Sequence, residues 1–335
     1  MSEKIRIAVD AMGGENSPKK VIDGILLHHK KSKDIFYKIF GDKNLIEKYI
    51  PKNFDKNNFD IVHTEEKIED TDTALGAAKK GKKTSMWLAI ESVKNKEADG
   101  IISSGNTGAL FILSKMNLKM IQNIDKPALA GLWPNKLGMN VVLDLGANVE
   151  CNEKDLSDFS IMGSALIKAL FDDVTAKVSL LNIGSEELKG NEVIKKTYQT
   201  LTENKNKLYE FNGFIEANQI MDGNSNVVVT DGFTGNVALK TAEGTANFIT
   251  SELKKTMSNS ILGKISALLN IKNLKNFKNK FDPRKYNGAI LLGLTSPVVK
   301  SHGSTDYLGF FYSLEVCEKT IKGNLIKKIT ENMHR

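Results

Sequence analysis

Six short stretches rich in glycine, asparagine and serine are the places where this sequence could bind a ligand. Glycine lets a backbone approach a ligand closely, and free N–H groups at a helix start favour an anion. In three stretches an asparagine follows a glycine closely, at Asn106, Asn148 and Asn236, which turn geometry alone does not require. The stretches are VDAMGGENSP (9–18), SSGNTGAL (103–110), LDLGANVEC (143–151), NIGSEELKGN (182–191), TDGFTGN (230–236) and SHGSTD (301–306).

Four charged or titratable side chains within these stretches have both a functional and a plain interpretation. Lys189 precedes a glycine, which suits anion binding, although most lysines are simply solvated. Asp231 is placed to cap the next helix, and Glu187 to favour a helix N-terminus. His302 is surrounded by turn residues, so a catalytic histidine and a capping or solvated one are both open interpretations.

Several familiar catalytic arrangements are missing. Cys151 follows the Gly-Ala-Asn turn and could accept an acyl group, but no histidine partner is identifiable beside it. No G-x-G or G-x-S-x-G motif occurs, which weakens a dinucleotide site and a serine hydrolase. The segment GAAKKGKK (76–83) imitates a phosphate-binding loop without its final Ser or Thr. Histidine and cysteine spacing predicts no metal site.

The elements that must position these stretches alternate between strands and helices. Apolar residues recur three and four apart over Thr84–Lys94 and Asp158–Phe171, which predicts helices. Short β-rich runs predict strands at Ile5–Asp10, Tyr37–Gly41, Phe59–His63, Gly100–Ser104, Asn140–Leu145, Lys177–Asn182, Asn226–Thr230 and Ala289–Leu294.

This alternation indicates an α/β fold with a mostly parallel sheet. In such sheets ligands bind beyond the carboxyl ends of the strands, which is where the six stretches lie. With no repeat and no linker in the sequence, we expect one α/β catalytic domain over 1–335, interrupted by a basic surface excursion at about 253–285.

The excursion accounts for the net positive charge of the chain. It holds nine basic residues and one acidic residue, while the whole chain has a net charge of +7, so the remainder is nearly neutral. Ile261, Ile265, Leu268, Leu269 and Lys272 fall at helical spacing and predict an amphipathic helix. This helix could dock an acidic carrier protein, contact anionic lipid, pack at a dimer interface, or present a solvated face.

The sequence also indicates a compartment. Two cysteines are too few for a disulfide framework, and the first residues lack the apolar core of a secretory signal. No apolar run is long enough to cross a bilayer. We therefore expect a cytoplasmic protein, with the basic excursion as a reason for peripheral contact at the inner face of the membrane.

Taken in order, the six stretches resemble the PlsX family, and the matches reach from Asp10 to Asp306. These enzymes of bacterial phospholipid synthesis move a fatty acyl group from acyl carrier protein to inorganic phosphate, giving acyl phosphate. The resemblance implies a three-layer α/β/α fold, akin to isocitrate and isopropylmalate dehydrogenases and to phosphotransacetylase. It also implies a homodimer. Glycine-rich helix N-termini and one lysine can bind phosphate without a metal, and we expect no cofactor. The product must reach a membrane acyltransferase, which is a further expected partner.

The resemblance and the residue types together give a set of candidate site residues. Lys189 and backbone amides would hold phosphate, the asparagines and His302 would orient the thioester carbonyl, and Asp231 would hold Lys189 or a substrate hydroxyl. The candidate catalytic residues are Lys189, Asp231, Asn236 and His302. The candidate substrate- and phosphate-binding residues are Gly13, Gly14, Ser104, Gly105, Asn106, Thr107, Gly146, Asn148, Glu187, Gly232 and Gly235.

Three alternative functions remain open on the sequence. A phosphotransacetylase-like enzyme would take its acyl group from acyl-CoA. A decarboxylating dehydrogenase of the same fold would need clustered arginines and aspartates, which are absent. A nucleic-acid-binding protein would use the basic excursion, but that segment has few aromatic residues for stacking on bases, so we expect no nucleic-acid partner.

Overall fold

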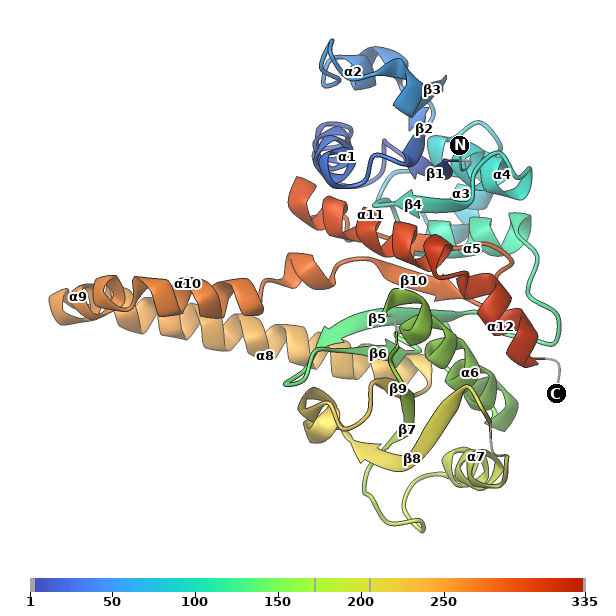
Figure 1. Ribbon diagram of the computed structural model, residues 1–335, viewed down its shortest axis with the longest axis vertical. Coiled ribbons are helices and arrows are strands. Elements are labelled where there is room, and N and C mark those ends of the chain that lie inside the picture. The colour runs from blue at the N-terminus through green and yellow to red at the C-terminus, as the bar shows by residue number, and fades with distance from the viewer. Residues whose placement is uncertain (1–3, 172, 205, 334–335) are drawn as a thin grey trace.

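The computed structural model describes residues 4–171, 173–204 and 206–333, so the two ends of the expected 1–335 domain lie outside the described residues. The described chain forms one eleven-stranded sheet in the order β3-β2-β1-β4-β11-β10-β5-β6-β9-β7-β8 (Figure 1). The strands are β1 (Ile5–Asp10), β2 (Ile35–Gly41), β3 (Phe59–His63), β4 (Gly100–Ser103), β5 (Ala128–Pro134), β6 (Met139–Leu143), β7 (Ala176–Asn182), β8 (Tyr209–Glu216), β9 (Val227–Val229), β10 (Ala289–Leu292) and β11 (Val298–Lys300).

The sheet consists of two parallel sets that run in opposite directions. Strands β3, β2, β1, β4 and β11 pair in parallel, and so do β6, β9, β7 and β8. Between the sets, β10 is antiparallel to β11 and β5, and β5 is antiparallel to β6. The mostly parallel sheet is confirmed, but the three antiparallel pairings reverse the direction of half of it.

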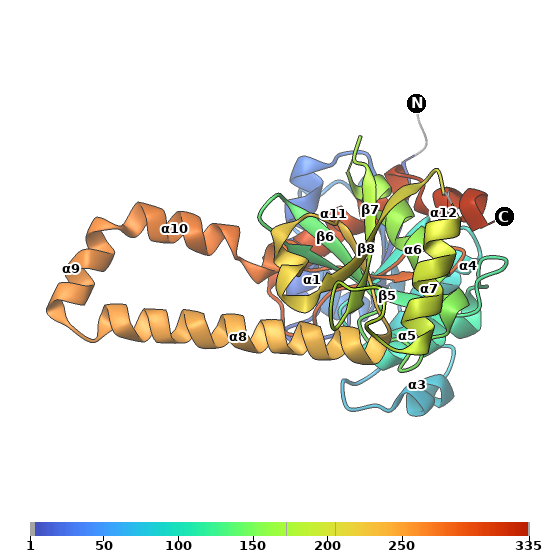
Figure 2. The same cartoon turned by 90° about the horizontal axis from the view of Figure 1, so that it is seen from below.

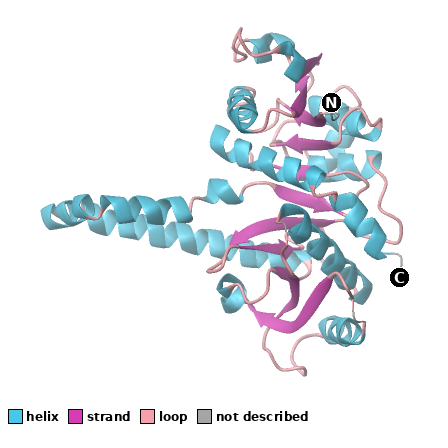
Figure 3. Ribbon diagram, in the orientation of Figure 1, coloured by secondary structure: helices cyan, strands magenta, loops and turns pink. Residues whose placement is uncertain are grey.

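Helices cover the sheet on both sides (Figure 3). They are α1 (Lys19–Lys31), α2 (Lys43–Glu47), α3 (Ala74–Lys80), α4 (Ser85–Lys94), α5 (Thr107–Asn117), α6 (Glu153–Leu170), α7 (Glu192–Glu203), α8 (Gly232–Ser258), α9 (Ile261–Leu269), α10 (Ile271–Lys280), α11 (Tyr307–Lys322) and α12 (Leu325–Met333). Short 3-10 turns span Lys56–Asn58, Ala217–Asp222 and Pro283–Tyr286.

The alternation of side chains along a strand assigns the layers. In β1, Ile7 and Val9 belong to the core that α1, α6 and α11 cover, whereas Ala8 belongs to the core under α4 and α5. Successive side chains of a strand point to opposite faces, so a strand buried on both faces needs helices on both. The predicted three-layer α/β/α architecture is confirmed.

Three strands lie outside the predicted set, and each has a local reason. Strand β5 contains Gly131 and ends in Pro134, and β8 mixes polar residues with Gly213. Strand β11 has only three residues. Glycine, proline and short length all weaken a strand pattern.

The second half of α8, with α9 and α10, forms an arm that projects from the body (Figure 2). The expected amphipathic helix covers Ile261–Leu269, but it ends at Asn270, so Lys272 lies in the next helix. No described residue of α9 or α10 is buried. In the described chain no helix is long and apolar enough to cross a membrane.

Candidate active site

The loops that follow β1, β4 and β11 are bonded to one another. The Ser104 hydroxyl donates to the Gly13 carbonyl at 2.6 Å, and the Glu15 amide donates to the Gly303 carbonyl at 3.0 Å. A Cβ on Gly13 would lie 2.5 Å from the Gly105 nitrogen, so glycine is required here by backbone packing. The structure brings together the predicted residues of the first, second and last stretches.

Below these loops lies a carboxylate that the sequence analysis did not select. Asp10 ends β1 and is fully buried, and it accepts hydrogen bonds from the hydroxyls of Ser85 at 2.7 Å and Ser103 at 2.6 Å. The Met12 amide donates to it at 3.2 Å. Burial raises the pKa of Asp10, while these donors oppose the rise. The network fixes the ends of β1 and β4 relative to α4.

His302 lies on the rim of this group. Its backbone amide donates to Asn287 Oδ1 at 2.9 Å, and its Nδ1 is 3.0 Å from the Ser304 hydroxyl. Partial burial and, next, the charge of Lys300 lower its pKa. The imidazole is therefore neutral at pH 7, and Nε2 has no hydrogen-bond partner among the described residues.

Asn106 uses its whole amide inside the protein. Its oxygen accepts the Ala109 amide at 2.9 Å and caps α5, and its nitrogen donates to the carbonyls of Asp70 and Asp72, each at 2.9 Å. Thr107, the first residue of α5, is exposed. These contacts favour a structural role for Asn106 and leave the hydroxyl of Thr107 at the surface.

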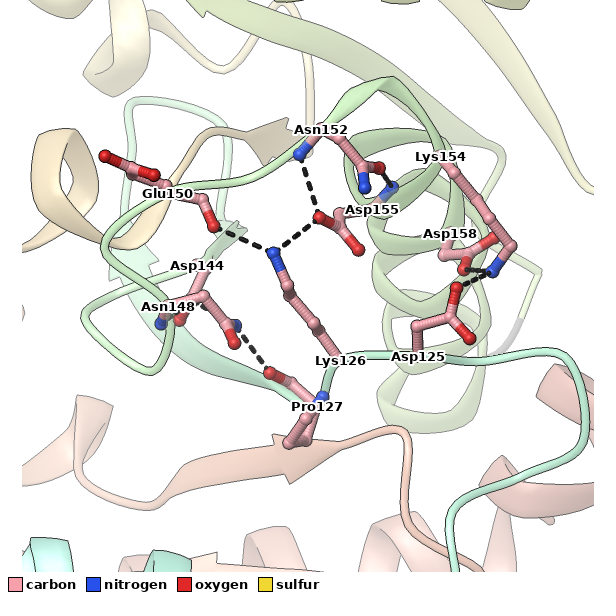
Figure 4. Close-up of polar contacts among 10 residues, drawn as sticks. All are labelled: Asp125, Lys126, Pro127, Asp144, Asn148, Glu150, Asn152, Lys154, Asp155 and Asp158. Atoms are coloured by element: carbon pink, nitrogen blue, oxygen red, sulfur yellow. Dashed lines mark hydrogen bonds and ion pairs between the residues drawn. The ribbon is translucent and has the colours of Figure 1, made fainter.

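A second group of candidate residues follows β6 and is built around Asp144 (Figure 4). This buried carboxylate accepts the backbone amides of Leu129, Gly146 and Ala147 through Oδ1, at 3.0, 3.2 and 3.0 Å. Its Oδ2 accepts the Asn148 amide at 2.7 Å and the Asn148 side chain at 2.8 Å. One side chain thus holds the complete Gly-Ala-Asn turn.

The far end of this turn is fixed by contacts with Lys126 and Pro127 of the preceding loop. Asn148 Nδ2 also donates to the Pro127 carbonyl at 2.7 Å. The Lys126 ammonium reaches the Glu150 carbonyl at 3.0 Å and Asp155 at 2.9 Å (Figure 4). The Asn148 amide, like that of Asn106, is committed to the fold.

The start of α8 packs directly on the same turn. Asp231 caps the helix, because its carboxylate accepts the Thr234 amide at 2.8 Å and the Thr234 hydroxyl at 2.9 Å. The Gly232 amide donates to the Asn148 carbonyl at 2.8 Å. The capping interpretation of Asp231 is therefore correct, and each of its two carboxylate oxygens accepts one hydrogen bond from Thr234.

Close packing also explains the glycines here. A Cβ on Gly235 would overlap the Asp144 carbonyl oxygen, and one on Gly232 would lie 2.5 Å from the Asn148 carbonyl oxygen. Asn236 lies beside Gly146, which is exposed at the tip of the turn. The amide of Asn236 is exposed and has no partner among the described residues.

The loop after β7 contributes Lys189. Its backbone amide donates to Glu186 O at 3.0 Å, and its carbonyl accepts Asn182 Nδ2 at 3.1 Å. Glu187 accepts the Tyr198 hydroxyl at 3.0 Å. The Lys189 ammonium is exposed and has no partner in the described part of the chain. Because β9 lies between β6 and β7, this loop shares a sheet edge with the Asp144 turn.

The candidate residues thus fall into two groups, and α8 connects them. Ala238, Leu239 and Ala242 pack against the core that contains Trp133, while Lys240 and Glu243 lie near enough to His302 to affect its pKa. At 1.5 Å per residue, the helix covers roughly 18 Å between Asp231 and Glu243. We call the residues around Asp10 and His302 the first group, and those around Asp144, Asp231 and Lys189 the second group.

Cys151 is a poor nucleophile in this structure. Burial and the nearby carboxylates of Asp144 and Asp155 raise the pKa of its thiol to about 12. The thiol is therefore protonated at neutral pH, and the thiolate is the nucleophilic form. Within the described residues, no group of three or more His, Cys, Asp and Glu side chains is arranged to hold a metal ion.

Sequence reasoning missed four groups that the structure makes prominent: Asp10, Asp144, Lys20 and Lys300. The two aspartates occupy the same sequence position, at the end of a buried strand and just before a glycine-rich turn. This repeated pattern of an aspartate between a buried strand and a glycine-rich turn could have identified both residues from the sequence. Nothing local marks the two lysines, because only the approach of distant loops buries them.

Comparison with known sequences gives one family and close relatives. Residues 5–328 match the model of the family described as fatty acid synthesis protein. A phosphate acyltransferase of Pelagibacter ubique is 64% identical over 333 residues, covering 99% of this chain and 100% of the relative. A phosphate acyltransferase of Paramagnetospirillum magneticum is 40% identical, covering 100% of this chain and 95% of the relative.

Solved structures share the fold. A phosphotransacetylase from Streptococcus pyogenes superposes with a TM-score of 0.64 at 14% identity, covering 96% of this chain and 95% of that chain. A 4-hydroxythreonine-4-phosphate dehydrogenase from Klebsiella pneumoniae gives 0.56 at 11% identity, with 95% and 99% covered. At such identities the likeness concerns the fold alone, and it agrees with the expected relation to phosphotransacetylase and dehydrogenase folds.

Proposed function

The chain belongs to the fatty acid synthesis protein family of acyltransferases, and we propose that it transfers a fatty acyl group from acyl carrier protein to inorganic phosphate. The product is acyl phosphate, which supplies phospholipid synthesis. One structural observation carries the proposal to particular residues. The Lys189 ammonium and the Asn236 side-chain amide are exposed and have no partner among the described residues, and both follow strands that end at the same sheet edge as the turn held by Asp144.

The reaction does not require a strong general acid or general base from the protein. A phosphate oxygen attacks the carbonyl carbon of the thioester, the tetrahedral intermediate collapses, and the C–S bond breaks. The departing thiol has an ordinary pKa of about 8.5, so it leaves without a strong general acid. Positioning the phosphate and stabilising the oxyanion supply the rate.

In this scheme each unpaired side chain of the second group of residues has a role. The Lys189 ammonium holds the phosphate dianion, and the Asn236 amide donates to the carbonyl oxygen as it gains charge. Asp231 keeps α8 in place through its cap and aligns the substrate with its remaining lone pairs. Gly146, at the exposed tip of the turn, lets the backbone approach the substrate.

The direct test is product formation. The protein is incubated with acyl carrier protein thioester and phosphate, and acyl phosphate is trapped with hydroxylamine and quantified. A parallel reaction with acyl-CoA identifies a phosphotransacetylase-like enzyme, and absorbance with a nicotinamide cofactor identifies a dehydrogenase. Absence of acyl phosphate with the carrier-protein donor overturns the proposal.

Replacing Lys189 by alanine is expected to lower kcat/KM for phosphate about 100-fold or more, because an uncompensated dianion must then approach the thioester. Asn236→Ala is expected to lower kcat with little change in the phosphate KM. Steady-state kinetics with varied phosphate measure both. Lys195→Ala, which removes a partly exposed lysine of α7 paired with Glu192, is the control and should stay within about twofold. Unchanged constants for Lys189→Ala remove that residue from the site.

The arm suits macromolecular partners, and we include them in the proposal. A soluble chain rarely exposes so much continuous apolar surface without something to cover it. A second copy of the chain covers α8 in a homodimer, and acidic acyl carrier protein or the anionic inner face of the membrane contacts the lysines of α10. The exposed apolar residues are Phe248, Ile249, Leu253, Ile261, Leu262, Ile265, Leu268, Leu269, Ile271, Phe277 and Phe281.

Reversing the charge of Lys272, Lys275 and Lys278 to glutamate is expected to weaken binding to acyl carrier protein or to anionic vesicles about tenfold or more at low salt, and less at high salt. Vesicle co-sedimentation and surface plasmon resonance measure the two partners separately. The control reverses three lysines on the body, Lys177, Lys195 and Lys196. If both partners bind the arm variant normally at low salt, the arm is only a solvated surface.

A further inference from the structure

Two lysines of the first group are largely buried and form no ion pair with a carboxylate among the described residues. Lys20 is 4% exposed, and its ammonium donates to the Gly303 carbonyl at 2.5 Å. Lys300, at the end of β11, is largely buried and donates to the carbonyl of Ser301. Among the described residues neither ammonium forms an ion pair with a carboxylate.

Each lysine lies close enough to the other for repulsion to act between them. Burial and, next, the charge of Lys20 lower the pKa of Lys300 to about 8, and burial lowers the pKa of Lys20. The charges of Glu15 and Asp70 act in the opposite direction on Lys20, and those of Asp70 and Asp10 on Lys300. None of these carboxylates forms an ion pair with either ammonium among the described residues, and Asp10 already accepts from three donors. Two largely buried like charges without an ion-pair partner cost folding free energy, and charges perturbed in this way are common at functional sites.

Glycines bring the backbone close to the Lys20 ammonium and leave one side of the loop at Gly303 open. Gly14 has a φ of +77°, and a Cβ there would lie 2.8 Å from Lys20 Nζ. A Cβ on Gly303 would meet only the Ser104 carbonyl oxygen within 4 Å, so that side of the loop is open. The same loops lead into α5, whose first turn presents N–H groups without intrahelical acceptors. The open side at Gly303 and the free N–H groups of α5 favour an anion.

We propose that Lys20 and Lys300 bind a phosphoryl group of one of the two substrates, at a site separate from Lys189. The proposal rests on the proposed function for the identity of those substrates. Two sources share this chemistry: inorganic phosphate, and the phosphodiester of the pantetheine arm that carries the acyl group. The stretch of α8 between the two groups of residues favours the arm, because an extended substrate can reach from the first group to the thioester in the second.

Equilibrium binding tests the site without requiring turnover. Isothermal titration calorimetry of the full-length protein uses inorganic phosphate, 4′-phosphopantetheine, and pantetheine, which lacks the phosphate. In the wild type, a phosphorylated probe should bind more tightly than pantetheine. Lys20→Met and Lys300→Met should each weaken that probe about tenfold or more. Lys19→Met, an exposed neighbour paired with Asp23, is the matched control and should bind normally.

The outcomes separate the sources and the proposals. If the two variants lose affinity for inorganic phosphate, the site binds the acceptor substrate. If they lose affinity for 4′-phosphopantetheine alone, the site binds the pantetheine arm of the donor. Equal affinity of wild type and both variants for both phosphorylated probes overturns the inference. The calorimetry measures binding and not product, so its result can be interpreted even if the protein fails to transfer an acyl group. Equally, the product assay can succeed even if the two lysines bind no phosphoryl group.

A pH series and a melting experiment exclude a purely structural role. Lys300 faces Lys20, Asp70, Asp10 and His302, and it loses its charge as pH rises through about 8. The Kd of the phosphorylated probe should therefore rise above pH 8 in the wild type and remain flat in Lys300→Arg, which stays charged. Without ligand, Lys300→Met should melt at a higher temperature than wild type. A lower melting temperature with normal binding identifies a structural lysine and overturns the inference.

Discussion

Replacing Asp144 by asparagine is expected to lower the free energy of unfolding by about 3–5 kcal/mol and to abolish acyl transfer. Each carboxylate oxygen accepts at least two N–H bonds, from Leu129, Gly146 and Ala147 on one side and from Asn148 on the other. An amide has a single oxygen. In either orientation its NH₂ group faces N–H donors, so buried donors are left without acceptors.

Urea unfolding followed by circular dichroism measures this loss, and activity is assayed in the same preparation. The control is Asp222→Asn, which removes a surface ion pair between Asp222 and Lys136 and should cost about 1 kcal/mol or less. If Asp144→Asn unfolds at the wild-type urea concentration, the turn is not held by this carboxylate, and the rigidity assigned to the second group is wrong.

Replacing Gly235 by alanine is expected to lower the free energy of unfolding by about 3 kcal/mol and to reduce activity strongly. The new Cβ would overlap the Asp144 carbonyl oxygen, which is backbone and cannot move like a flexible side chain. The first turn of α8 must then shift away from the Gly-Ala-Asn turn. Asn236, the next residue, would shift with it.

The same helix offers a matched control in Gly244, where a Cβ would meet nothing within 4 Å. Gly244→Ala should raise stability by up to about 1 kcal/mol, because alanine favours a helix interior over glycine. Thermal unfolding of the two variants should give changes in stability of opposite sign, with the mass of each variant checked by light scattering. A gain in stability for Gly235→Ala would show that α8 does not pack against the turn in solution.

Much of the fold could be predicted from local patterns. Strands such as Ile5–Asp10 and Phe59–His63 have the bounds expected from their β-rich runs. The cap of α8 could also be predicted, because Asp231 directly precedes a helical repeat and its side chain caps the helix. Strand β11 was not readable, because three residues gain their strand character only from pairing with β4 and β10.

The candidate residues could be found from the sequence, but their grouping could not. Glycine-rich strand ends identified both His302 and Lys189, and the antiparallel strands β10 and β5 separate them into different groups. Strand direction depends on pairing between segments more than a hundred residues apart, which no local pattern records. Lys20 and Lys300 were missed for the same reason, because their burial arises from loops that meet only in the folded chain.

The sequence by itself determined the class of fold, the six polar strand ends and the family resemblance, since each depends on neighbouring residues or on a string of motifs. Tertiary structure decided which polar side chains form hydrogen bonds within the protein and which remain available to a substrate. Asn106, Asn148 and Asn236 follow the same kind of turn, yet the first two use their amides to bind carbonyls and a carboxylate, and the third has no partner among the described residues. An amide's partner is supplied by whichever segment folds against it, so its availability for substrate is a property of packing.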